Sequence, residues 1–279
     1  MLIPTGVLVA DARAAGRAIP AFNVITIEHA EAIVAGAEAA GLPVILQISE
    51  NAVKFHGNRL APVAAAAAAI GATAGVGVSL HLDHVKDLDL LDQAAAHGFS
   101  SVMVDASRLP YDENVATTAA AVERLHAQGL WVESELGEVG GKAGDPHAPG
   151  VRTDPAEAAR YVAATGVDAL AVAVGSSHAM TSRTARLDHD LITALRDAIA
   201  IPLVLHGSSG VPDGELTAAV RAGMVKINIG TALNTAFTGA VRETLAADES
   251  LVDPRKYLAP ARDAIASVVA RLTTLLAGD

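Results

Sequence analysis

The sequence predicts a closed (β/α)8 barrel, the TIM-barrel fold. Short apolar runs alternate with longer alanine-rich helical segments along the whole chain of 279 residues. Within the short runs the apolar residues are consecutive, which is typical of parallel strands that are buried on both faces. Polar side chains follow nearly every strand, as the mouth of a barrel requires. A doubly wound open sheet is the alternative, but it would bind its ligand at one switch point of the strand order.

The expected elements form one domain that covers residues 1–279. Expected strands are 18–24, 43–48, 76–82, 100–104, 130–135, 167–174, 201–205 and 224–229. Expected helices are 28–40, 62–71, 87–97, 114–128, 155–164, 191–198 and 215–222, with further C-terminal helices within 254–279. Several helices end at a glycine, which is a common helix stop.

Composition excludes several classes of protein. A formal net charge of -11 argues against nucleic acid or an anionic membrane surface as the main partner. The chain has no cysteine, so any metal must be held by histidine and carboxylate side chains. No run resembles a membrane-spanning segment, and residues 1–15 lack the pattern of a secretion signal. We therefore expect a cytoplasmic protein with a small-molecule substrate.

Three histidines each follow an expected strand: His84, His178 and His206. A single histidine at a strand end is more often a hydrogen-bonded structural residue, but three at the same end of a barrel predict a shared metal ion. Neutral imidazole binds zinc or iron(II) well, and three protein ligands are typical of a catalytic metal site. Asp83 precedes His84, and strict strand alternation would point the two apart. The chain is therefore expected to leave regular strand geometry there.

Two acids, Asp105 and Glu135, end the fourth and fifth strands. Each either accepts an N–H hydrogen bond from a metal-binding histidine or a loop amide, or provides an alternative or second metal position, and the sequence leaves both interpretations open. Lys226 on the eighth strand could form a Schiff base, but a single lysine is weak evidence for that chemistry. We expect it to pack or to pair with an acid.

Glycine-rich segments follow the seventh and eighth strands, at 206–210 and 226–231. Loops at these positions of a barrel commonly bind phosphate through backbone N–H groups and the amino end of a helix. Ser209, Asn228 and Thr231 can add side-chain contacts. The adjacent histidine predicts that a substrate phosphate lies close to the metal.

These motifs resemble the class II, metal-dependent ketose-bisphosphate aldolases that act on fructose or tagatose 1,6-bisphosphate. The resemblance covers almost the whole chain through the segments 81–84, 133–141, 175–178, 206–210, 228–231 and 253–258. It implies a (β/α)8 fold and a reversible cleavage of the ketose to dihydroxyacetone phosphate and an aldehyde, through a metal-stabilised enediolate.

The resemblance also implies residue roles. His84, His178 and His206 would bind the catalytic Zn²⁺, Asp83 would be the acid–base at the C4 hydroxyl, and Asp105 and Glu135 would hold a second or alternative divalent ion, with a monovalent cation nearby. Arg255 would reach a second phosphate from a neighbouring subunit of a homodimer or homotetramer. The implied substrate-binding residues are Asn23, Ser49, Ala179, Arg183, Gly207, Ser208, Ser209, Asn228, Gly230, Thr231 and Arg255.

Two departures from the family pattern bear on the substrate. No glutamate follows Gly140 and Gly141, so Asp145 or His147 is a candidate replacement. Ala179 stands where the family has glycine, and Arg183 is the expected phosphate contact in that loop. The alternatives are an aldolase for a different ketose 1-phosphate, such as a sulfonated or deoxy sugar, a metal-assisted hydrolase, or a non-catalytic sugar-phosphate-binding or partner subunit.

Overall fold

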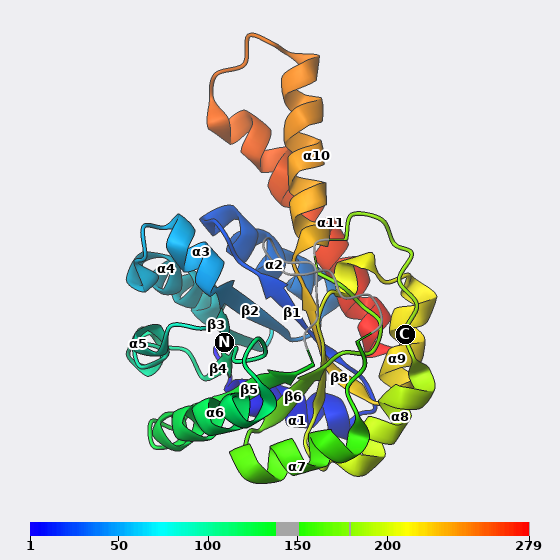
Figure 1. Cartoon of the computed structure of the whole chain (residues 1–279). Coiled ribbons are helices and arrows are strands. Elements are labelled where there is room, and N and C mark those ends of the chain that lie inside the picture. The colour runs from blue at the N-terminus through cyan, green and yellow to red at the C-terminus, as the bar shows by residue number, and fades with distance from the viewer. Residues whose placement is uncertain (138–150, 179, 279) are drawn as a thin grey trace.

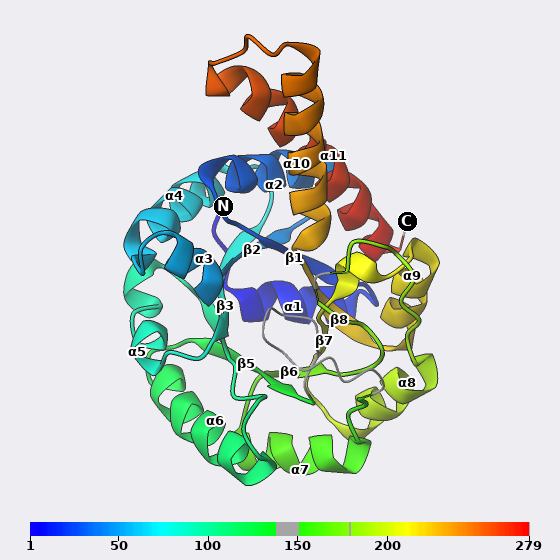
Figure 2. The same cartoon turned by 45° about the horizontal axis from the view of Figure 1, so that its top comes forward.

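A computed structural model describes residues 1–137, 151–178 and 180–278. Eight parallel strands close into a barrel in sequence order, and helices surround it (Figures 1 and 2). The predicted fold class is confirmed. The strands are β1 (Ile19–Asn23), β2 (Val44–Ser49), β3 (Val78–Val85), β4 (Ser101–Val104), β5 (Trp131–Leu136), β6 (Ala169–Val172), β7 (Leu203–Leu205) and β8 (Met224–Ile229).

The described α-helices surround the strands or lie at one end of the barrel. They are α1 (Thr5–Ala14), α2 (Ile27–Ala40), α3 (Glu50–Phe55), α4 (Leu60–Thr73), α5 (Leu88–Leu91), α6 (Tyr111–His126), α7 (Pro155–Thr165), α8 (His189–Ala198), α9 (Asp213–Ala222), α10 (Thr231–Ala247) and α11 (Pro254–Ala277). Short 3₁₀ turns lie at η1 (Ala95–His97) and η2 (Ser208–Gly210).

Helix α1, which the sequence analysis did not predict, lies across the amino-terminal end of the barrel (Figure 2). Its buried residues Leu8, Val9 and Ala12 pack with Ile19 and Val225 of the strands. This apolar cluster closes the barrel floor. The histidines that follow the strands lie at the opposite, carboxyl end.

Other differences lie in the connections. The single helix expected at 87–97 is interrupted, and only α5 and η1 form there. Helix α3 was not expected, and it begins directly after β2 with the Ser49 hydroxyl accepting a hydrogen bond from the Ala52 amide. Helix α10 was also missed. Both α3 and α10 border the barrel mouth.

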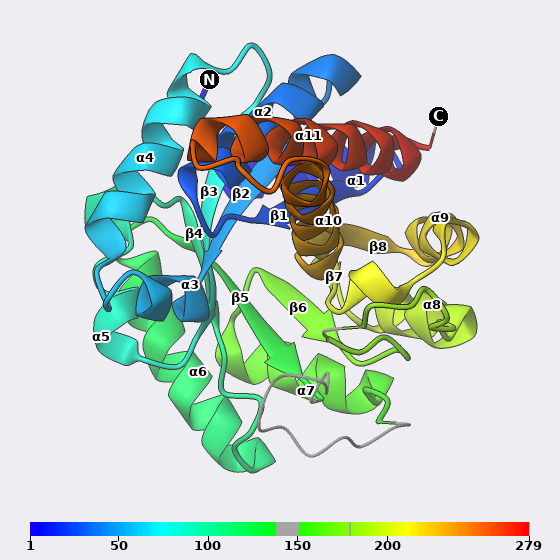
Figure 3. The same ribbon diagram turned by 90° about the horizontal axis from the view of Figure 1, so that it is seen from above.

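Helices α10 and α11 are antiparallel, and their far ends project beyond the barrel (Figures 1 and 3). The inner part of α11 packs on α2 through buried Ile265 and Val269. In the described part of the chain, no helix is long and apolar enough to cross a membrane.

Gly36 makes the close approach of α2 and α11 possible, and Gly36→Ala is expected to lower the free energy of unfolding by about 1–3 kcal/mol. A methyl group there would lie 2.5 Å from the Ala266 carbonyl oxygen and 2.7 Å from the Val269 Cβ. Urea unfolding measures the effect. Gly239→Ala in α10 is the control: its Cβ would meet nothing within 4 Å, and removing a helical glycine should stabilise by up to about 1 kcal/mol. Equal stabilities would contradict the packing argument.

Candidate metal centre and active site

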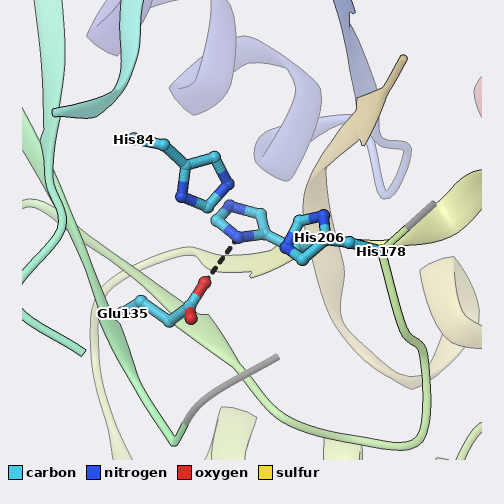
Figure 4. A group of neighbouring side chains, drawn as sticks. All are labelled: His84, Glu135, His178 and His206. Carbon is cyan, nitrogen blue, oxygen red and sulfur yellow. Dashed lines mark hydrogen bonds and ion pairs between the residues drawn. The ribbon is translucent and has the colours of Figure 1, made fainter. Parts of the chain in front are cut away.

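Four side chains from four parts of the barrel meet at its carboxyl end: His84, Glu135, His178 and His206 (Figure 4). One ligand atom from each lies within 4.8 Å of the others. The imidazole centroids are 4.6 Å apart for His84 and His206, 5.2 Å for His84 and His178, and 5.7 Å for His178 and His206. Three imidazoles and a carboxylate without a thiolate form a donor set that suits zinc.

The backbone at His84 explains how two consecutive residues face the same site. His84 has a φ of +50°, in the left-handed region that non-glycine residues seldom adopt. The pairing of β3 with β4 shifts register between Leu82 and Val85. Because the strand turns at this point, Asp83 and His84 both line the cavity at the mouth. The expected departure from strand geometry is confirmed.

His206 is completely buried between two glutamates of β5. Its Nε2 lies 3.0 Å from Glu133 Oε1 and its Nδ1 lies 2.7 Å from Glu135 Oε2. Burial lowers the pKa of His206, but the hydrogen bonds to Glu133 and Glu135 outweigh it and raise the pKa to about 9. Nδ1 is thus the nitrogen that faces Glu135, which is one of the four residues of the cluster.

Asp105 lies behind His84 and outside the four-residue cluster. Its Oδ2 is 3.1 Å from His84 Nδ1, and its Oδ1 accepts a hydrogen bond of 2.7 Å from the Ser107 hydroxyl. A carboxylate at this place fixes the ring orientation of His84 and leaves Nε2 for the metal. The geometry therefore favours the first of the two interpretations of Asp105, whereas Glu135 lies among the ligand atoms themselves.

Asp83 is 2% exposed and stands beside the metal cluster. Its Oδ1 accepts a hydrogen bond of 3.3 Å from Asn228 Nδ2. Burial raises the pKa of Asp83, but nearby His84, His81 and Lys226 more than offset this and lower the pKa. An ionised carboxylate in this position can accept a proton from a substrate hydroxyl.

A cavity of about 470 Å³ opens above the cluster. It is lined by most of the residues predicted to bind substrate, and a sugar phosphate fits its volume. The predicted residues that line it are Asn23, Ser49, Asp83, His84, His178, Gly207, Ser208, Ser209, Asn228, Gly230 and Thr231.

One wall of this cavity is formed by the loops after β7 and β8. The Ser209 hydroxyl accepts a hydrogen bond of 3.1 Å from the Ala232 amide in the first turn of α10, and the Ser208 hydroxyl donates to the Asn228 carbonyl. Gly230 precedes α10 and lets the Asn23 carboxamide approach, since a Cβ there would lie 2.8 Å from Asn23 Oδ1. Backbone amides and a helix amino end thus converge, which is a suitable arrangement for phosphate.

Gly207 is a tightly packed position of this wall that also has a positive φ. Its φ is +67°, and a Cβ would lie 2.6 Å from the Ser177 carbonyl carbon. Gly207→Ala is expected to lower stability by about 1–2 kcal/mol and to raise KM for a ketose 1-phosphate about tenfold, because the loop must shift. Steady-state kinetics and thermal unfolding measure the two effects. Gly214→Ala, where a Cβ meets nothing within 4 Å, should change neither the KM nor the loop; equal KM values for both variants would contradict the assignment.

Two arginines that were predicted to bind substrate do not line the cavity. The Arg183 guanidinium donates to the Val211 carbonyl and forms an ion pair with Asp213. The Arg255 side chain is 89% exposed at the start of α11, where it pairs with Asp253. Neither reaches the site within this chain. Ala179, Asp145 and His147 lie outside the described residues.

Residues on the opposite wall of the cavity were not predicted from the sequence. Ten residues, 50–59, separate the end of β2 from the start of α4, and α3 lies among them. The side chains of α3 could not be assigned to the cavity from the sequence, because this short helix was not predicted. Gln47 and Glu133 could have been predicted to lie near the site. Each lies two residues before a predicted site residue, Ser49 or Glu135, and side chains two residues apart point to the same face of a strand. The missed residues that line the cavity are Ile25, Gln47, Glu50, Asn51, Ala52, Lys54, Phe55, Lys86 and Asn234.

A closed parallel barrel with a histidine cluster and an adjacent aspartate at its carboxyl end defines a metal-dependent barrel enzyme. The model of the family "fructose-bisphosphate aldolase class-II" matches residues 4–278. The fructose-bisphosphate aldolase of Geobacillus stearothermophilus is 41% identical over 254 residues, covering 90% of this chain and 88% of the relative. A probable fructose-bisphosphate aldolase of Bacillus subtilis is 41% identical over 260 residues, covering 92% and 91%.

Solved structures agree with this relationship. The YdjI aldolase from Escherichia coli K12 matches with a TM-score of 0.86 at 32% identity over 99% of this chain and 97% of that chain. A putative fructose-1,6-bisphosphate aldolase from Coccidioides immitis matches with a TM-score of 0.87 at 29% identity over 98% and 96%. The chain belongs to the class II fructose-bisphosphate aldolase family. The resemblance seen in the motifs is confirmed: the protein is an aldolase, of a family that is in general zinc-dependent.

Proposed function

We propose that this aldolase uses zinc to cleave a ketose 1,6-bisphosphate, of the fructose or tagatose type, reversibly to dihydroxyacetone phosphate and an aldehyde. The observation that carries the proposal is the meeting of His84, His178 and His206 beside Asp83 at one end of a phosphate-binding cavity. We also expect the protein to act in the cytoplasm.

The three histidines would hold the zinc, and Glu135 lies close enough to add a carboxylate ligand. When bound, zinc supplies Lewis-acid stabilisation of the negative charge that develops on the ketose oxygens. The protein's own residues keep the ligands in position: Asp105 orients His84, and Glu133 orients His206. Outer partners of this kind are part of the metal affinity.

Asp83 would act as the acid–base of the reaction. In cleavage it takes the proton of the C4 hydroxyl, which lets the C3–C4 bond break, and in synthesis it returns that proton to the new hydroxyl oxygen. Its lowered pKa keeps it ionised for the first of these steps. The amide of Asn228 fixes the carboxylate at Oδ1.

The backbone of Gly207 to Ser209, together with Gly230 and Thr231, would anchor the phosphate of dihydroxyacetone phosphate. This would hold the breaking bond between Asp83 and the proposed metal ligands, and such positioning lowers the barrier because the reacting groups are already oriented. On the opposite wall, Lys54 and Lys86 line the cavity and bring two positive charges to it.

The direct test is product formation. The protein should convert fructose or tagatose 1,6-bisphosphate to dihydroxyacetone phosphate, measured with a coupled reduction of that product. Release of inorganic phosphate without dihydroxyacetone phosphate would instead support a metal-assisted hydrolase. Binding of dihydroxyacetone phosphate without turnover of either bisphosphate would support a sugar-phosphate-binding subunit.

Zinc binding should release protons, because the metal requires a neutral imidazole and the metal-free His206 has a pKa of about 9. The ring is mostly protonated at pH 7, so the proton must leave when zinc enters. Apparent zinc affinity is therefore expected to rise by about tenfold per pH unit up to about pH 9. Calorimetry at pH 7.5 in buffers of different ionisation enthalpy measures the protons released. An affinity that is constant between pH 6.5 and 8.5 would contradict this coupling.

A homodimer or homotetramer is part of the proposal. The support is the position of Arg255, whose side chain is exposed at the start of α11, on the part of the helix that projects beyond the barrel, and does not line the cavity of its own chain. Sedimentation velocity distinguishes the monomer from the assembly.

A further inference from the structure

Lys226 of β8 is buried completely in the interior of the barrel beneath the cavity. Its Nζ lies 2.8 Å from Glu133 Oε2 and donates a hydrogen bond of 2.6 Å to Asn228 Oδ1. Lys226 is not among the cavity-lining residues, so its amine is not placed to attack a substrate carbonyl. A buried lysine–glutamate pair seldom stabilises a fold more than packed apolar residues would. The fold alone therefore does not account for it.

The contact with Asn228 determines which end of that amide faces Asp83. A lysine ammonium has three donors and no acceptor, so the Asn228 atom beside it must be the carbonyl oxygen. The amide NH₂ then points the other way, to Asp83 Oδ1 at 3.3 Å. A flipped amide would put an oxygen against the Asp83 carboxylate.

The contact with Glu133 has a parallel consequence for His206. Lys226 forms an ion pair with Glu133 Oε2, and Glu133 Oε1 lies 3.0 Å from His206 Nε2. An ionised Glu133 only accepts, so Nε2 keeps its hydrogen whether or not a metal is bound. Nδ1, which faces Glu135 at 2.7 Å, is then the nitrogen that gives up its proton to supply a lone pair to the metal.

We propose that Lys226 is a positioning residue that sets the hydrogen-bond direction on both sides of the site at once: through Asn228 to the acid–base Asp83, and through Glu133 to the metal ligand His206. The inference rests on the proposed function, because it assigns Lys226 a role toward those two groups. Lys226 touches neither substrate nor metal. Its ammonium also offsets the negative charge that Glu133, Glu135 and Asp83 bring into the barrel.

The test is Lys226→Met, which keeps the length of the side chain and removes the donors. Zinc affinity, measured on the metal-free protein by competition with a chromogenic chelator, is expected to fall about 10–100-fold. At saturating zinc, kcat for bisphosphate cleavage should fall about tenfold or more while KM changes less, because the phosphate wall is untouched. A variant that is folded but has wild-type zinc affinity and kcat would overturn the proposal.

Thr165→Val is the matched control for losing a buried polar group. The Thr165 hydroxyl is buried at the end of α7 and donates only a local hydrogen bond of 2.8 Å to the Tyr161 carbonyl of the same helix. This variant should lose stability but keep zinc affinity and kcat. A loss of zinc affinity as large as that of Lys226→Met would show that any buried polar loss has the same effect, and the proposal would fail.

A double variant, Lys226→Met with Glu133→Gln, guards against a misfolded single variant because it removes one buried charge of each sign. A carboxamide can donate or accept, so it no longer imposes a direction on His206, and zinc affinity should remain low. Wild-type zinc affinity in the folded double variant would overturn the proposal. Failure of the unmodified protein to bind zinc or to form dihydroxyacetone phosphate would instead overturn the proposed function.

Discussion

Asp83→Ala is expected to lower kcat for bisphosphate cleavage by about 10²–10⁴-fold, the usual contribution of a positioned acid–base group. Asp83 lies beside the metal cluster but is not one of its four residues, so zinc affinity should change little. The loss should therefore appear in kcat under saturating zinc. Steady-state cleavage of fructose 1,6-bisphosphate measures it.

Proton exchange separates this role from a general disturbance of the site. Exchange at C3 of dihydroxyacetone phosphate does not involve the C4 hydroxyl, so Asp83→Ala should retain most of it while cleavage is lost. Asp197→Ala on the exposed end of α8 is the control and should keep wild-type rates. Cleavage by Asp83→Ala within threefold of the unmodified protein would exclude Asp83 as the acid–base.

Removal of the metal is the second large effect. Dialysis against a chelator is expected to lower turnover by about 10³-fold or more, since Lewis-acid stabilisation contributes several kcal/mol. Addition of one equivalent of zinc should restore the rate. Turnover that persists with less than 1% residual metal would rule out the metal mechanism.

The histidine ligands provide the matched variants for that experiment. His178→Ala should stay inactive after zinc is added back, because one imidazole of the cluster is missing. His126→Ala removes a histidine that pairs with Asp168 on the outside of the barrel, and it should behave as the unmodified protein does. Equal recovery of both variants would mean that His178 is not a ligand.

The barrel and the meeting of the three histidines could be predicted from the sequence because both depend on local patterns. Consecutive apolar residues indicate buried parallel strands, and a polar residue after each strand can lie only at one end of a parallel barrel. This is enough to bring His84, His178 and His206 together although they are distant in sequence. The turn of the chain at Asp83 and His84 followed from the same alternation rule.

The parts that were missed depend on contacts between distant segments. Helix α1 closes the barrel floor by packing on strands far along the chain, and its own pattern of residues is only weakly amphipathic. The position of the Arg183 side chain depends on its contact with Asp213, thirty residues away in the sequence. Local sequence patterns do not predict contacts between residues so far apart. The partner of Lys226 was expected to be an acid, but only the folded barrel shows that it is Glu133.

Position 84 combines two requirements in a single residue. In the proposed function its side chain supplies an imidazole nitrogen to the metal, and its backbone has a left-handed conformation that valine or isoleucine would resist. Asparagine and aspartate tolerate that backbone and also bind divalent ions, whereas cysteine supplies a soft ligand without the same backbone preference. An attempt to exchange the metal of this enzyme by redesigning the ligand is thus restricted at residue 84 to a narrower set of amino acids than at His178 or His206.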